Sequence, residues 1–142
     1  MQTIQDVMTP DVQCVAPTDS IRRAAQMMDA LNVGAIPVLD GESLVGMITD
    51  RDIAIRSTAK GKDPESDRVG NVMSPEVRTC HPGQSVDEVL KEMGDQQIRR
   101  VPVIDQASHQ MVGIVSLGDM AVKAKTATDK ALGEISAPGG QQ

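Results

Sequence analysis

The chain contains two stretches in which apolar residues recur every three or four positions, which is the spacing of an amphipathic helix. Ser20 and Ser85 stand directly before these stretches, and serine is a preferred residue at a helix N-cap. The pattern therefore predicts one helix in each half of the chain. The apolar positions of the two helices are Ile21, Ala24, Ala25, Met28 and Leu31, and Val86, Val89, Leu90 and Met93.

Each predicted helix is followed by two short apolar runs with a polar turn between them. The runs lie at 36–39 and 44–48, and at 101–104 and 111–115. Runs of this length, bounded by turn residues, are typical of a β-hairpin. Thr49 and Ser116 come directly after the hairpins, and as N-cap residues they predict a further short helix in each half.

The two halves are copies of one sequence unit. At an offset of 65, the first copy matches the second at Val7 and Val72, Met8 and Met73, Pro10 and Pro75, Ser20 and Ser85, and Pro37 and Pro102. The second copy then gains two residues, so that Gly46 aligns with Gly113 and Asp52 with Asp119 at an offset of 67. An ordered series of matches with one small slip indicates an internal duplication.

Composition and charge exclude several classes of protein. The 142 residues include nine Met but no Phe, Trp or Tyr, so the core must be aliphatic, with Met filling gaps. A net charge of −6 and the missing rings argue against nucleic-acid binding. No apolar run approaches the ~20 residues of a membrane span. The N-terminus has no secretion signal, and with two Cys this favours reduced thiols in a cytoplasm.

The repeated motifs resemble the CBS domain, the module named after cystathionine β-synthase. They are Val7-Met8-Thr9-Pro10, Pro37-Val38-Leu39-Asp40 and Gly46-Met47-Ile48-Thr49-Asp50-Arg51-Asp52, and then Val72-Met73-Ser74-Pro75, Pro102-Val103-Ile104-Asp105 and Gly113-Ile114-Val115-Ser116-Leu117-Gly118-Asp119. The likeness covers residues 1 to about 125. The chain looks like a stand-alone tandem pair, a Bateman module, and is similar to the small bacterial hypoxic-response type of CBS protein.

The resemblance implies an α+β fold of two CBS repeats, each β-α-β-β-α, packed sheet to sheet about a pseudo-twofold axis. We expect repeat 1 at 1–56, a polar surface linker at 57–67 and repeat 2 at 68–125. A short helix and a flexible tail are expected at 126–142. In this family the clefts between the repeats commonly bind adenosine nucleotides, and pairs commonly form homodimers.

Two pairs of residues are the leading candidates for binding ribose and phosphate: Thr49 with Asp52, and Ser116 with Asp119. A hydroxyl at a helix N-cap and a carboxylate three residues later lie at the same helix end. The carboxylate can accept hydrogen bonds from two ribose hydroxyls, and the helix start can meet a phosphate. The structural alternative is a plain capping box, in which the same groups satisfy backbone donors.

The remaining candidates come from the resemblance. Arg99 and Arg100 stand where family members often contact phosphate, and a guanidinium suits that geometry. They could also be a solvated surface pair, and their counterparts in repeat 1 are Gly34 and Ala35. The adenine pockets would be lined by Pro10, Val12, Val33 and Ile36, and by Pro75, Val77, Ile98 and Val101. The alternative for each of these apolar residues is a plain core role, which we expect for most of them.

We therefore expect a non-enzymatic regulatory module that binds an adenosine nucleotide and signals through a conformational or dimer change. Its target would be another, unknown protein, with no membrane or nucleic-acid partner and no cofactor apart from the regulatory nucleotide. The alternative is an interaction or scaffold dimer with vestigial clefts. Catalysis has little support, because His81 and His109 have no triad partner in sequence. Zinc is disfavoured because Cys14, Cys80 and the two His lack paired ligand spacing.

Overall fold

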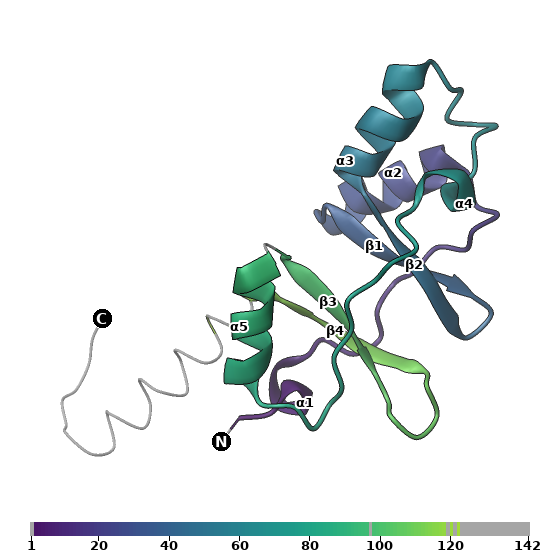
Figure 1. The fold of residues 1–142 in the computed structure, drawn as a ribbon. Helices are drawn as coiled ribbons and strands as arrows, with labels where there is room; N and C mark the ends of the chain where they lie inside the picture. Colours follow the sequence, from purple (N-terminus) through teal and green to yellow (C-terminus); the bar gives the residue numbers. More distant parts are fainter. Residues whose placement is uncertain (1, 97, 119, 121, 123–142) are drawn as a thin grey trace. The chain divides into compact units, whose positions relative to one another are not determined.

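The computed structural model describes residues 2–96, 98–118, 120 and 122, and its chain forms two compact units (Figure 1). Unit 1 combines Met1–Pro10, Thr79–Asp105 and the chain from Val112 onward. Unit 2 combines Asp11–Arg78 with Gln106–Met111. Neither unit is a single continuous stretch, so the compact bodies cut across the two sequence repeats.

Unit 2 is a helix packed on a two-stranded sheet. Its elements are α2 (Ile21–Leu31), β1 (Ala35–Asp40), β2 (Ser43–Thr49), α3 (Asp50–Asp52), the π-helical turn η1 (Ile53–Ser57), the 3₁₀ turn η2 (Thr58–Lys60) and α4 (Val69–Val72). Strands β1 and β2 pair antiparallel from Ala35↔Thr49 to Asp40↔Ser43, with a bulge between Val38 and Leu39. The predicted hairpin is therefore present, and a short helix follows it.

The core of unit 2 lies between α2 and the sheet. Its buried members are Val15, Ile21, Ala24, Met28, Ile36, Val38, Ile48, Val69 and Val72. The predicted apolar stripe of α2 is thus correct at Ile21, Ala24 and Met28, whereas Ala25 is exposed and Leu31 is 42% exposed. The helix stops there because Asn32 takes the left-handed conformation, with φ of 55°.

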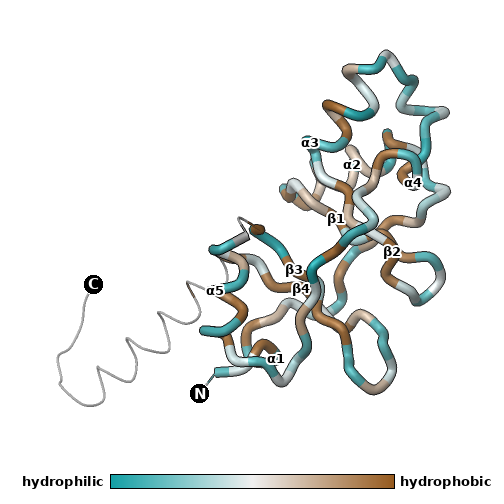
Figure 2. Tube along the Cα trace, in the orientation of Figure 1, coloured by the Kyte–Doolittle hydropathy of each residue, from teal (hydrophilic) through white to brown (hydrophobic). Residues whose placement is uncertain are grey.

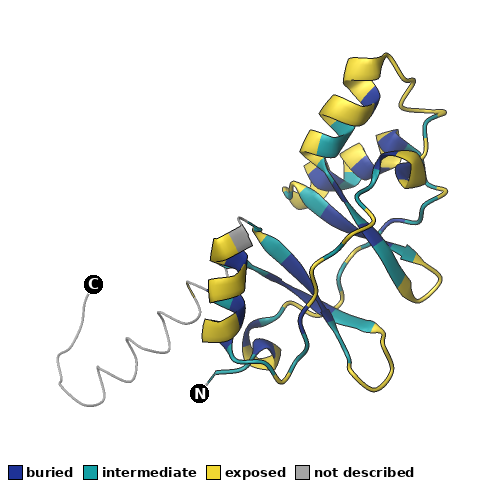
Figure 3. Cartoon of the chain, viewed as in Figure 1, coloured by how far each residue is buried: buried dark blue, intermediate teal, exposed yellow. Residues whose placement is uncertain are grey.

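Unit 1 repeats this arrangement with the second copy. It contains α1 (Ile4–Val7), α5 (Val86–Gln96), β3 (Arg100–Ile104) and β4 (Met111–Ser116), with β3 and β4 hydrogen-bonded in one sheet. Figure 3 shows the buried positions of α5 on its side toward the strands, and Figure 2 shows the strands as the most apolar segments. The core residues are Ile4, Val7, Cys80, Val86, Val89, Met93, Val101, Val103, Val115 and Met120.

The two repeats exchange their leading helices. Helix α1 precedes repeat 1 in sequence, yet it belongs to unit 1, where the Ile4 amide donates to the carbonyl of Gln84 at 2.9 Å. Helix α4 precedes repeat 2 but belongs to unit 2, where the Val69 amide donates to the carbonyl of Asp19 at 2.9 Å. Ile4 and Val69 are equivalent positions and both are fully buried. Each unit therefore needs a helix from the other repeat to complete its core.

A glycine in each hairpin makes room for the exchanged segment. A Cβ on Gly46 would lie 2.8 Å from both Sδ of Met73 and the carbonyl oxygen of Ser74. A Cβ on Gly113 would lie 2.8 Å from Sδ of Met8. Met8 and Met73 are equivalent positions of the two sequence copies, and each packs over the Cα of a glycine. A side chain at either glycine would displace the Met above it.

The predicted linker at 57–67 is more structured than a surface connection. Ser57 is buried, and its hydroxyl donates to Oδ2 of Asp67 at 2.8 Å. The carbonyls of Asp67 and Pro64 accept from the amides of Ile21 and Arg22, both at 3.1 Å. These amides are among the donors that a helix start leaves unsatisfied. The linker therefore caps α2, although most of its side chains are exposed.

The predicted C-terminal helix and tail at 126–142 lie outside the described residues, as does Asp119. The described part of the chain contains no helix that is long and apolar enough to cross a membrane.

Candidate functional site

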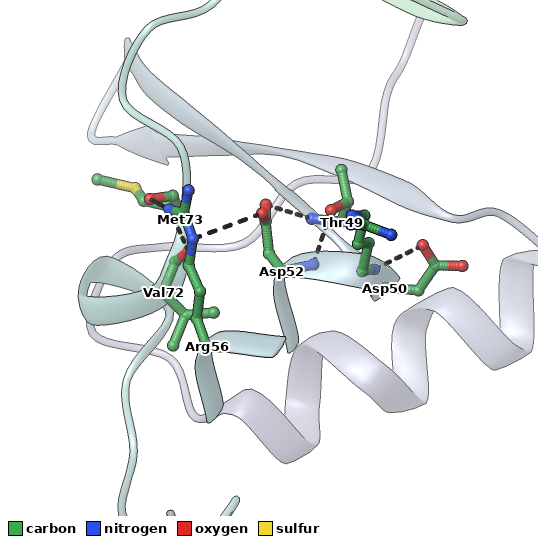
Figure 4. Close-up of polar contacts among 7 residues, drawn as sticks. Thr49, Asp50, Asp52, Arg56, Val72 and Met73 are labelled. Carbon is green, nitrogen blue, oxygen red and sulfur yellow. Dashed lines mark hydrogen bonds and ion pairs between the residues drawn. The ribbon is translucent and has the colours of Figure 1, made fainter. Parts of the chain in front are cut away.

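The candidate pair of repeat 1 sits where β2 ends and α3 begins. The Thr49 hydroxyl accepts from the amide of Asp52 at 3.0 Å, and Oδ2 of Asp52 accepts from the amide of Thr49 at 3.1 Å. This reciprocal arrangement is a capping box, so the structural role considered from the sequence is present (Figure 4). The capping bonds also fix both side chains in one geometry.

Capping leaves part of the Asp52 carboxylate for other partners. Within the described chain, Oδ2 carries the capping bond, whereas Oδ1 meets only Nε of Arg56 at 4.0 Å. Arg56 is held by its Nη1, which donates to the carbonyls of Val72 and Met73 at 3.3 and 3.4 Å (Figure 4). The Asp52 side chain is 14% exposed. An ionised carboxylate accepts about four hydrogen bonds, so Asp52 has capacity for a ligand hydroxyl.

A second acidic residue adjoins this pair. The Asp50 amide donates to the carbonyl of Gly34 at 2.9 Å, which ties the start of α3 to the turn before β1. A Cβ on Gly34 would lie 3.0 Å from Oδ2 of Asp50. Sequence reasoning did not select Asp50 or Arg56. The sequence did contain a signal for Asp50, because the two repeats differ at this site. Repeat 1 has Gly34 and Asp50 where repeat 2 has Arg99 and Leu117, at offsets of 65 and 67.

The apolar candidates of repeat 1 divide between the two units. Val12, Val33 and Ile36 belong to unit 2 together with Thr49. Ile36 is 1% exposed and is a core residue, while Val12 and Val33 are half-buried. Pro10 is exposed and belongs to unit 1, so its place in an adenine pocket stays a prediction.

The candidates of repeat 2 are only partly brought together. Ser116 ends β4, and the amide of Leu117 donates to the carbonyl of Arg99 at 2.7 Å, the counterpart of the bond between Asp50 and Gly34. Ile98 is half-buried against the unit 1 core, and Val101 is part of that core. The other two apolar candidates, Pro75 and Val77, belong to unit 2, and Asp119 lies outside the described residues.

The two candidate phosphate ligands differ in exposure. Arg99 is exposed, and Arg100 in β3 is half-buried. Nε of Arg100 is buried and has no hydrogen-bond partner in the described part of the chain. A buried guanidinium donor without an acceptor costs free energy, so this atom favours an anionic partner.

Both cysteines are free thiols whose pKa values are raised by burial. Burial, and then the charge of Glu92, raises the pKa of Cys80 to about 12. Burial also raises the pKa of Cys14. Among residues 2–96, 98–118, 120 and 122, no three His, Cys, Asp or Glu gather as a metal-binding group.

The fold and the repeated site define a tandem pair of CBS domains. The protein-family model described as CBS domain matches residues 4–57 and 69–124, and the chain belongs to this family. It is 46% identical over 122 residues to CBS domain-containing protein YhcV of Bacillus subtilis, covering 86% of this chain and 85% of that protein. It is 38% identical over 122 residues to hypoxic response protein 1 of Mycobacterium tuberculosis, covering 85% and 84%.

Solved structures agree with this assignment. Hypoxic Response Protein I with two coordinated zinc ions aligns with a TM-score of 0.76 at 38% identity, covering 85% of this chain and 98% of that one. The CBS domain pair of protein MJ0100, in complex with 5′-methylthioadenosine and S-adenosyl-L-methionine, aligns with a TM-score of 0.74 at 28% identity, covering 89% and 98%.

Proposed function

We propose that this chain is a non-enzymatic regulatory module that binds an adenosine ligand through Thr49 and Asp52 of repeat 1 and Ser116 and Asp119 of repeat 2. Family membership supports a regulatory role, and the adenosine compounds bound by the MJ0100 domain pair support the ligand class. The protein would act in the cytoplasm as a homodimer and control a separate target protein.

The main support for this proposal is the unused hydrogen-bond acceptor capacity of the Asp52 carboxylate. Its Oδ2 is fixed by the amide of Thr49, and its Oδ1 keeps unused acceptor capacity within the described chain. Two vicinal ribose hydroxyls are donors of the kind that such an oxygen accepts. A charge-assisted hydrogen bond of this type contributes about 1.5–3 kcal/mol, which is roughly ten- to a hundredfold in affinity.

Signalling requires that the ligand binds one conformation of the chain, or of its dimer, more tightly than another. Aliphatic residues must enclose the base, because the chain contains no aromatic side chain to stack on it. The adenine edge would then be recognised by backbone hydrogen bonds in a mostly apolar pocket.

The test separates ligand binding from helix capping. Thr3 and Asp6 form a second capping box at α1, and neither is a candidate site residue. Both Asp52→Ala and Asp6→Ala lose a cap, which costs about 0.5–2 kcal/mol of stability. Titration calorimetry with AMP and with 5′-methylthioadenosine should show weaker binding of at least one compound in Asp52→Ala only.

Two outcomes would contradict the proposal. If neither compound binds the unmodified protein at millimolar concentration, the chain is the ligand-free scaffold considered from the sequence. If Asp52→Ala binds both compounds as tightly as Asp6→Ala does, the carboxylate is a cap and nothing more.

For the assembly, sedimentation should give twice the monomer mass at micromolar concentration, and the monomer mass would count against a homodimer.

A further inference from the structure

The two repeats carry opposite charge at equivalent positions of their candidate sites. In repeat 1, positions 34, 35 and 50–52 are Gly, Ala, Asp, Arg and Asp. The matching positions 99, 100 and 117–119 in repeat 2 are Arg, Arg, Leu, Gly and Asp. Repeat 1 thus has two carboxylates and one guanidinium, and repeat 2 has one carboxylate and two guanidinium groups. At these five positions the net charge is −1 in repeat 1 and +1 in repeat 2.

The backbone shows that these positions are equivalent in space as well as in sequence. The amide of Asp50 donates to the carbonyl of Gly34 at 2.9 Å, and the amide of Leu117 donates to the carbonyl of Arg99 at 2.7 Å. In each unit, one hydrogen bond therefore ties the residue after the N-cap to the turn before the first strand. The backbone positions of the two pairs are therefore equivalent in their units.

Gly34 and Asp50 depend on each other. The backbone of Gly34 is outside the left-handed region, since only Gly41 and Gly61 have positive φ among the described glycines. Its backbone would accept any residue, but a Cβ would approach Oδ2 of Asp50 to 3.0 Å. The Asp50 carboxylate thus occupies the space into which a side chain at 34 would extend, where repeat 2 has Arg99.

Asp50 forms no ion pair among the described residues. Arg56 is committed to Asp52 and to the carbonyls of Val72 and Met73. The Asp50 side chain accepts only from the backbone amide of Arg51, at 2.8 Å, and makes no ion pair within the described chain. In unit 1, by contrast, Nε of Arg100 is a buried donor without a partner among the described residues.

We propose that the two sites select adenosine ligands of different charge, with Gly34 and Asp50 as specificity-determining residues. The repeat 1 site takes a ligand with an uncharged or cationic 5′ group, such as a 5′-thioadenosine or a sulfonium adenosine. The repeat 2 site takes a 5′-phosphate. This inference rests on the proposed function. Asp50 and Asp52 lie in the same short helix, so the Asp50 charge acts on a ligand anchored there, screened over a Debye length of ~8 Å.

The experiment isolates each site and compares three probes: AMP, 5′-methylthioadenosine and S-adenosyl-L-methionine. Asp119→Ala leaves the repeat 1 site intact, and Asp52→Ala leaves the repeat 2 site intact. Calorimetry should show that Asp119→Ala prefers the two probes without phosphate to AMP by at least about tenfold, and that Asp52→Ala has the reverse preference.

A swap of the paired residues makes the test specific. In the Asp119→Ala background, Gly34→Arg with Asp50→Leu copies Arg99 and Leu117 and should shift the preference toward AMP by at least about tenfold. The reciprocal Arg99→Gly with Leu117→Asp, in the Asp52→Ala background, should shift it the other way. If a swapped protein fails to fold by circular dichroism, Asp50→Asn keeps the shape of the side chain and should give a smaller shift in the same direction.

The outcomes are distinguishable. Equal affinity of the repeat 1 site for all three probes, or an unchanged ratio in the swapped and Asp50→Asn proteins, would overturn the charge selection while leaving adenosine binding intact. Binding of none of the three probes to the unmodified protein would contradict the proposed function itself, and the charge selection with it.

Discussion

Truncation of Ile4 tests whether the first helix of the chain stabilises the second repeat. Ile4 is fully buried in the unit 1 core, and the neighbouring backbone bonds join it to Gln84. Ile4→Ala removes about three methylene-sized groups, and at about 0.8 kcal/mol each this is about 2.4 kcal/mol. The cavity left behind raises the loss in free energy of unfolding to about 3–4 kcal/mol.

Hydrogen exchange with mass spectrometry shows where the loss falls. Peptides from α5, β3 and β4 should lose most protection, although Ile4 precedes repeat 1 in the sequence. The matched variant is Val69→Ala, at the equivalent position of the other copy. It should lose about 2–3 kcal/mol, and protection should fall mainly in α2, β1 and β2. If Ile4→Ala lost more protection from hydrogen exchange in α2 and β1 than in α5 and β3, the exchange of helices would be refuted.

Three further predictions concern stability and reactivity. Gly46→Ala should destabilise by about 1–3 kcal/mol in urea unfolding followed by circular dichroism, whereas Gly94→Ala, whose new Cβ has no neighbour within 4 Å, should stabilise by up to about 1 kcal/mol. A destabilising Gly94→Ala would contradict the packing argument. The hydrogen bond from the Ser57 hydroxyl lowers the pKa of Asp67, so its carboxylate stabilises the fold above the unfolded pKa of about 3.9, and this contribution disappears as pH falls through the lower folded value. Melting temperatures of Asp67→Asn should therefore depend less on pH in that acid range than those of the unmodified protein. Because the pKa of Cys80 is about 12, iodoacetamide should label Cys14 first in the native protein, and equal labelling rates would contradict the burial of Cys80.

Much of the fold could be predicted from local pattern. The helices after Ser20 and Ser85 and both hairpins follow from periodicity and capping, which act between residues close in sequence. The exchange of α1 and α4 could not be predicted this way, because Ile4–Val7 is a four-residue helix with only Ile4 and Val7 buried, and its sequence does not indicate which core receives it. The exchange depends instead on contacts between residues distant in sequence, such as the packing over Gly46 and Gly113.

In the candidate site, too, the local contacts could be predicted from the sequence and the contacts between distant residues could not. The spacing of Thr49 and Asp52 predicts their reciprocal bonds, since a capping box is a local motif. The roles of Asp50 and Arg56 depend on contacts with Gly34 and with the carbonyls of Val72 and Met73, which are distant in sequence. Similarly, the polarity of the linker predicts exposure, but it does not show that Asp67 caps α2.

Equilibrium dialysis read by ultraviolet absorption tests the central claim most directly. The chain has no Trp and no Tyr, so purine absorption dominates the near-ultraviolet spectrum of a complex. The unmodified protein is dialysed against AMP or 5′-methylthioadenosine up to millimolar concentration, where a dissociation constant of 1 mM corresponds to about −4.1 kcal/mol. The account predicts a saturable excess of absorbance in the protein chamber, and the excess of 5′-methylthioadenosine is reduced in Asp52→Ala but not in Asp6→Ala. Equal absorbance in both chambers for both compounds would contradict it.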